Sequence, residues 1–144
     1  MFNIIEKYQE ALNTSHPDQI IDEIADSLEY EKVNREEIII LVDKLINQAM
    51  SKANDQIKES VFNAICNAVI YQNVAEFIKW DAFIDNISSI NERYLEYIFI
   101  CLGFSHEMKY ISTLKSFLNH PNQDIIQHAQ EAIQEIEFNI KRGN

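Results

Sequence analysis

Glycine and proline are scarce in this sequence. Only Gly103, Gly143, Pro17 and Pro121 occur among its 144 residues. A β-sheet protein of this length needs many tight turns, and those turns usually require glycine, proline or Asn-Gly pairs. The scarcity therefore favours α-helices joined by short polar connections. It also excludes the glycine-rich phosphate loop and the dinucleotide-binding fingerprint, each of which needs several glycines close together.

Cysteines and long apolar runs are also scarce. Cys66 and Cys101 are the only cysteines, and they lie too far apart for a CxxC redox or zinc motif. Apolar runs such as residues 38–42 are short, whereas a membrane-spanning helix needs about 20 apolar residues. The amino-terminal segment MFNIIEKYQE is amphipathic and acidic, which is unlike a signal peptide. We therefore expect a cytoplasmic protein with reduced thiols and no membrane association.

Basic residues are outnumbered by acidic ones. The chain has 12 lysines and arginines against 23 aspartates and glutamates, for a formal net charge of −11. Such a field repels the phosphate backbone of nucleic acids and anionic membrane surfaces, and it favours a basic protein partner. The densest acidic stretch, residues 18–37, is either a solubilising face or a second anionic binding patch.

No motif for catalysis or metal binding is present. The four histidines, His16, His106, His120 and His128, form neither HExxH nor a pair spaced by four. Cys101 falls on a predicted apolar helix stripe, where cysteine usually acts as a small hydrophobe. Cys66 lies off the apolar stripe of its own predicted helix and is expected to be partly exposed, with no basic neighbours to activate its thiol. We therefore expect no enzyme activity, no metal and no cofactor.

Apolar residues recur at helical spacing along the chain. The pattern predicts a first helix over residues 2–13 and a second that begins at Pro17. A third helix follows Asn34 as its N-cap, and a fourth runs from Asp55 as its N-cap to about Tyr71. Residues 74–88 are predicted to hold one or two short helices, and the aromatics in and beside them are expected to form a small core: Tyr71, Phe77, Trp80 and Phe83. The alternative for Trp80 is a binding anchor, since tryptophan is enriched at interface hot spots. Further helical segments follow Asn91, Ser105 and Asn122.

One apolar pattern occurs three times, with a small residue at its third position. The three sets are Ile57, Val61, Ala64, Ile65 and Ala68; Tyr94, Ile98, Cys101, Leu102 and Ser105; and Ile125, Ala129, Ala132, Ile133 and Ile136. Small residues at such positions let neighbouring helices approach closely. Spacings in the thirties are typical of helical solenoids.

Residues 93–136 resemble HEAT-like helical repeats. The resemblance rests on the Leu102-Gly103 helix end, the stripe from Tyr110 to Leu118, the turn at residues 119–122 and the helix that follows. Asp124 matches the family pattern, but Ile126 stands where an arginine is expected. The resemblance implies a single domain over residues 1–144, all-α, forming a short right-handed α-solenoid of antiparallel helix pairs with about seven to nine helices.

By that resemblance, the second helices of the repeats, at about residues 55–71, 91–104 and 122–139, line a concave binding face. Their outward positions also include Ile100, and the predicted partner-binding residues are Glu59, Phe62, Asn63, Glu92, Glu96, Phe99, Asp124, Gln127 and Glu131. Phe62 and Phe99 occupy matching positions, as do Glu59 and Glu96. Acidic residues beside exposed aromatics suit a basic protein partner.

In size, acidity and lack of catalytic motifs, the chain resembles immunity proteins of bacterial polymorphic toxin systems, including contact-dependent growth inhibition. This resemblance implies that it binds a cognate toxin, favoured to be a basic nuclease, and covers the toxin's active site. A generic HEAT-like adaptor or assembly factor is the first alternative. A HEAT-like DNA glycosylase is the second, although it requires a basic groove.

Overall fold

The computed structural model describes residues 3–143, with side chains described for residues 3–139. These residues form eight α-helices and short 3₁₀ helices, with no β-strand among them, so the all-α prediction and its helix number are confirmed. None of the helices in this part of the chain combines the length and apolarity that crossing a membrane requires. The chain divides into two compact units, Met1–Val74 and Ala75–Asn144.

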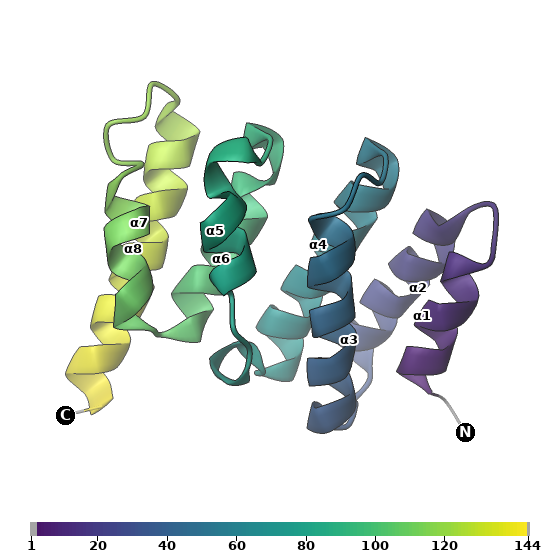
Figure 1. The fold of residues 1–144 in the computed structure, drawn as a ribbon. Helices are drawn as coiled ribbons and strands as arrows, with labels where there is room; N and C mark the ends of the chain where they lie inside the picture. Colours follow the sequence, from purple (N-terminus) through teal and green to yellow (C-terminus); the bar gives the residue numbers. More distant parts are fainter. Residues whose placement is uncertain (1–2, 144) are drawn as a thin grey trace. The chain divides into compact units, whose positions relative to one another are not determined.

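Unit 1 contains four α-helices, shown in purple to teal in Figure 1. They are α1 (Ile4–Leu12), α2 (Pro17–Tyr30), α3 (Arg35–Ala49) and α4 (Asp55–Gln72). α1 packs on α2 and α3, while α4 packs along both α2 and α3. The apolar stripes predicted for these segments provide the contacts, because their regularly spaced isoleucine, leucine and valine side chains are buried.

Asparagine side chains begin three helices of unit 1. Asn3 accepts hydrogen bonds from the backbone at the start of α1, and Asn34 does so for α3 as predicted. The predicted N-cap of α4 is wrong by one residue. Asn54 accepts a 2.9 Å bond from the Ile57 backbone N–H, while Asp55 lies in the first turn, where its charge is favourable.

Side-chain hydrogen bonds connect α2 to α4 along their length. The bonded partners follow the same order in both helices: Asp18 with Gln56, Ala25 with Asn67, and Leu28 with Gln72. The two helices therefore run in the same direction. This is the relation that corresponding helices of consecutive helical hairpins have to one another.

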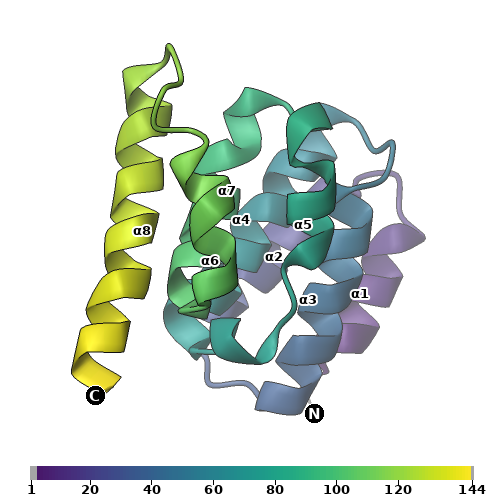
Figure 2. The same cartoon turned by 60° about the vertical axis from the view of Figure 1, so that its left-hand side comes forward.

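Unit 2 begins with short helical segments and ends with the longest helix of the chain. Its elements are η1 (Ala75–Phe77), α5 (Asp81–Asn86), η2 (Ile87–Ser89), η3 (Glu92–Tyr94), α6 (Leu95–Ser105), η4 (Met108–Tyr110), α7 (Ile111–Lys115) and α8 (Gln123–Gly143). α8 packs along α6 and α7, and the views in Figures 1 and 2 agree on this arrangement. Asn91 and Asn122 cap the segments that follow them, as their positions predicted.

A small aromatic core lies at the start of unit 2. Trp80 and Phe83 are fully buried and stacked, with ring centroids 5.8 Å apart, as predicted. The same prediction is wrong for Tyr71 and Phe77, which are each about half exposed. The Tyr110 hydroxyl accepts a 3.1 Å bond from the Trp80 backbone N–H and donates a 2.9 Å bond to Asp81.

This hydrogen-bonded arrangement shifts two pKa values in opposite directions. Burial raises the pKa of Tyr110 to about 12, and the bond to Asp81 adds to the effect. The hydrogen bond from Tyr110 lowers the pKa of Asp81, with further help from Lys109. Both shifts favour a protonated tyrosine that donates to an ionised aspartate, which fixes α5 to η4.

α6 and α8 approach each other closely and run in the same direction. Glu96 lies beside His128 near the start of both helices, and His106 lies beside Glu135 further along. At Gly103, an added Cβ would lie 3.1 Å from the Ala132 Cα atom, so a larger residue would require the neighbouring backbone to shift by a few tenths of an ångström. Ala64, Cys101 and Ala132, the small residues of the repeated pattern, are all buried as predicted.

Candidate functional site

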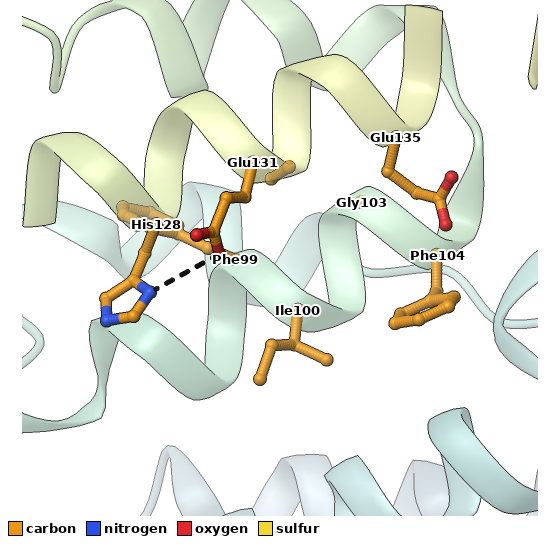
Figure 3. A pocket seen from close by; sticks show the side chains of 8 residues that line it. Phe99, Ile100, Gly103, Phe104, His128, Glu131 and Glu135 are labelled. Carbon is orange, nitrogen blue, oxygen red and sulfur yellow. Dashed lines mark ion pairs between the residues drawn. The ribbon is translucent and has the colours of Figure 1, made fainter. Parts of the chain in front are cut away.

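A pocket of about 220 Å³ lies between α6 and α8 of unit 2 (Figure 3). Its lining comes from these two helices alone: Phe99, Ile100, Gly103 and Phe104 from α6, and His128, Glu131, Ala132 and Glu135 from α8. The parallel packing brings one apolar helix face against the amphipathic α8. The pocket therefore has an apolar floor and a charged rim.

The apolar floor follows from the composition of α6. This helix is apolar on nearly every side, so packing against its neighbours still leaves Ile100 partly exposed and Phe104 37% exposed. Gly103 has no side chain to fill the space between them, and on α8 the small side chain of Ala132 lies against it. The floor consequently offers an accessible aromatic and aliphatic surface.

One end of the rim is formed by an imidazole between two carboxylates. His128 Nε2 lies 3.7 Å from Glu96 on α6, and His128 Nδ1 lies 3.8 Å from Glu131 on α8. Gln127 donates a 3.1 Å hydrogen bond to the other oxygen of Glu131. Figure 3 shows Glu131 and His128 projecting from α8 toward one another at this end of the pocket.

The other end of the rim has a similar arrangement. Glu135 lies 3.8 Å from His106 Nε2, and His106 Nδ1 lies 2.6 Å from Glu76. His106 adopts a left-handed conformation, with φ of 57°, just after the end of α6. This conformation ends the helix and places the imidazole where both carboxylates reach it.

The rim therefore carries excess negative charge. Four carboxylates, Glu76, Glu96, Glu131 and Glu135, lie against two imidazoles, so acidic side chains outnumber the basic ones in these ion pairs. The side chain of Glu135 is 34% exposed and that of Glu131 is 58% exposed. A partly buried carboxylate above an apolar surface attracts cations more strongly than a fully solvated one.

Several of the predicted partner-binding residues meet at this site. Phe99 lines the pocket, Glu96 and Glu131 hold His128, and Gln127 bonds to Glu131. Two predicted residues lie outside it in the same unit. Glu92 lies 3.4 Å from His120, and Asp124 is exposed in the first turn of α8.

The remaining predicted residues belong to α4 of unit 1. Asn63 is exposed and Glu59 is partly exposed, but Phe62 is only 1% exposed, so its predicted outward orientation is wrong. The prediction assumed one buried stripe. α4 instead buries adjacent positions from residue 60 to residue 69, which no single stripe can cover. Cys66, expected to be partly exposed, is buried for the same reason.

Phe99 also differs from its predicted orientation. It is 1% exposed, and its ring packs edge-on against Phe117 at a centroid distance of 5.0 Å. α6 has so few polar residues that its sequence does not distinguish an outward face. Phe99 therefore belongs to the core beneath the pocket, and Phe104 is the accessible aromatic.

Some lining residues were not predicted: Gly103, Phe104, His128, Ala132 and Glu135. A usable signal was present on α8, because His128, Glu131 and Glu135 are spaced by three and four and so form one ridge of a helix. That spacing does not indicate which helix packs beside the ridge. Only the packing of α6 on α8 brings the apolar floor beside this ridge.

The acidic stretch at residues 18–37 is less uniform than its sequence suggests. Asp18 is buried and accepts a 2.9 Å hydrogen bond from Gln56, so it stabilises unit 1. Asp22 and Asp26 are exposed. Tyr30 is 80% exposed, and the neighbouring Glu29 carboxylate raises its pKa. Unit 1 thus carries its own acidic and aromatic surface.

No group of three or more histidine, cysteine, aspartate or glutamate side chains has the geometry of a metal site in the described part of the chain. Comparison with protein-family models, curated proteins and solved structures finds no match.

Proposed function

We propose that the protein is a non-enzymatic binding protein whose α6–α8 pocket contacts a basic protein. One observation carries this proposal: Glu131 and Glu135 project from one ridge of α8 beside an accessible apolar floor on α6. An apolar centre with a charged rim is the usual anatomy of a specific protein interface. The net charge of −11 would steer a basic partner toward it.

We further propose that this partner is a bacterial toxin and that the protein acts as its immunity protein in the cytoplasm. Support comes from the resemblance in size, acidity and lack of catalytic motifs. A basic nuclease is the favoured toxin, because an acidic inhibitor imitates the charge of nucleic acid. The short HEAT-like α-solenoid also remains part of the proposal, supported by the parallel pairs α2–α4 and α6–α8 within the two units.

A HEAT-like adaptor would use the same kind of surface, so gene context rather than surface chemistry separates it from an immunity protein. A glycosylase is disfavoured by the site itself, since its groove must attract phosphate groups. The rim carboxylates Glu96, Glu131 and Glu135 would repel them.

The product of the gene immediately upstream provides the test, because an immunity gene follows its toxin gene. The purified protein should bind that product, suppress its activity at a one-to-one ratio, and associate more slowly as salt rises. Surface-immobilised binding kinetics at low and high salt, together with a toxicity assay in cells, measure these effects. Absence of binding, with both proteins folded, would reject the immunity proposal.

A further inference from the structure

We propose that the α6–α8 pocket receives one arginine side chain of the partner, with its stem on the apolar floor and its guanidinium between Glu131 and Glu135. This inference rests on the proposed function and names the group that is recognised. The volume of the pocket, the chemistry of its floor and the placement of its carboxylates all favour this occupant.

The volume limits what can enter. Pockets that enclose drug-sized molecules measure about 300–1,000 Å³, whereas this pocket measures about 220 Å³. A nucleotide or a folded helix is too large for it, while a single long side chain fits. The pocket is therefore a socket for one residue within a larger contact surface.

The lining favours arginine over the other long side chains. Ile100, Phe104 and Ala132 offer apolar area for a methylene stem, and carboxylates stand at both ends of the pocket. A guanidinium is weakly hydrated, stacks on aromatic rings and donates in several directions at once. A lysine ammonium is a compact, strongly hydrated charge that makes less use of Phe104. An uncharged side chain would bring no positive charge to these carboxylates.

The same carboxylates already have imidazole neighbours. Glu131 lies beside His128, which also faces Glu96, and Glu135 lies beside His106, which also faces Glu76. A guanidinium placed between Glu131 and Glu135 would therefore share each carboxylate with the imidazole beside it.

The test is a nuclear magnetic resonance titration of the full chain with Nα-acetyl-arginine-methylamide. The citrulline analogue is the neutral control, and the lysine analogue tests the choice of cation. The methyl signals of Ile100 and Ala132 report on the pocket. We expect saturable shifts at these signals with arginine, smaller shifts with lysine and none with citrulline.

Matched variants assign the effect to the rim. E131Q and E135Q should each weaken arginine binding by up to about fivefold, as expected for partly exposed ion pairs. E137Q, at an exposed position of the same helix, should leave it unchanged. Equal shifts with arginine and citrulline, or equal effects of all three variants, would overturn the proposal. Equal affinity for lysine would overturn the assignment of a guanidinium.

Failure of this inference can be told apart from failure of the proposed function. If the upstream gene product binds tightly while arginine leaves the pocket signals unmoved, the partner proposal stands and the socket is rejected. If arginine binds as described while the upstream product does not, the socket stands and the partner is wrong.

Discussion

Tyr110 links η4 to the start of α5 through one hydroxyl group. It accepts from the buried Trp80 backbone N–H and donates to Asp81. Tyr110→Phe would leave that N–H without its partner, and we expect the free energy of unfolding to fall by about 1–3 kcal/mol. Urea denaturation measures the change. Tyr30→Phe, at an exposed position, is the control and should change it by less than about 0.5 kcal/mol.

The raised pKa of Tyr110 predicts how the free energy of unfolding changes at alkaline pH. The pKa of Tyr110 is about 12 in the folded protein, above the ordinary value of about 10. Its contribution is therefore complete below about pH 10 and lost as the pH rises toward about 12. Stability measured between pH 9 and pH 12 should fall less steeply in Tyr110→Phe than in the natural protein. Parallel curves for the two proteins would contradict this assignment.

Two phenylalanines near the pocket should respond differently to truncation. Phe99 is buried against Phe117, so Phe99→Ala should lower the free energy of unfolding by about 3–5 kcal/mol. Phe104→Ala should cost about 1 kcal/mol of stability, because much of the ring is already exposed. It should instead speed dissociation of the partner by an amount corresponding to about 2 kcal/mol.

Denaturation and binding kinetics of these two variants separate the roles. Similar losses of stability in both would show that Phe104 belongs to the core. The sequence did not distinguish the two residues, because apolar positions surround them in α6. The sequence did predict the buried Cys101 and Trp80, since a small hydrophobe on an apolar stripe and a tryptophan in an aromatic cluster usually lie in a core.

At the scale of elements, the contact between α6 and α8 depends on the absence of a side chain at Gly103. Its added Cβ would meet backbone rather than a movable side chain. Gly103→Ala gains about 1 kcal/mol of helix propensity, but overpacking costs about 1–3 kcal/mol. We expect a net loss of about 1 kcal/mol in the free energy of unfolding. Ser112→Ala, exposed in α7, is the neutral control.

A thermal or urea transition for each variant provides the measurement. Stabilisation by Gly103→Ala would show that the two helices separate at no cost, which contradicts the close approach described here. The closeness of this approach was predicted from the small residue Ala132, one of the three that recur along the repeated pattern. Helix starts at Pro17, Asn34 and Asn122 were likewise predictable, because each depends on one local signal.

Other features of the elements were not predictable, because their causes are not local. The 3₁₀ segments η1, η2 and η4 carry no periodic pattern of useful length. α4 and α6 are buried on more than one side, so amphipathicity could not identify their outward residues. The pocket combines a face of α6 with a ridge of α8, and that pairing is decided by tertiary packing.

At the scale of the whole molecule, the net charge of −11 predicts the kind of partner but not the surface that meets it. Two acidic surfaces are available. One is the rim of the α6–α8 pocket, with Glu131 and Glu135, and the other is the exposed part of residues 18–37, including Asp22. The rim is favoured because it adjoins an apolar pocket that can hold a side chain of the partner.

Charge reversal on each surface tests this choice, and with it the central claim. The measurement is the association rate with the upstream gene product as a function of salt, for Glu131→Lys/Glu135→Lys and for Asp22→Lys/Asp26→Lys as the control with the same change of charge. The rim variant should associate at least about tenfold more slowly and lose most of its salt dependence. The Asp22→Lys/Asp26→Lys variant should change the rate by less than about threefold. An equal or larger effect of that control, or an association rate that changes neither with salt nor with the rim substitutions, would contradict the account.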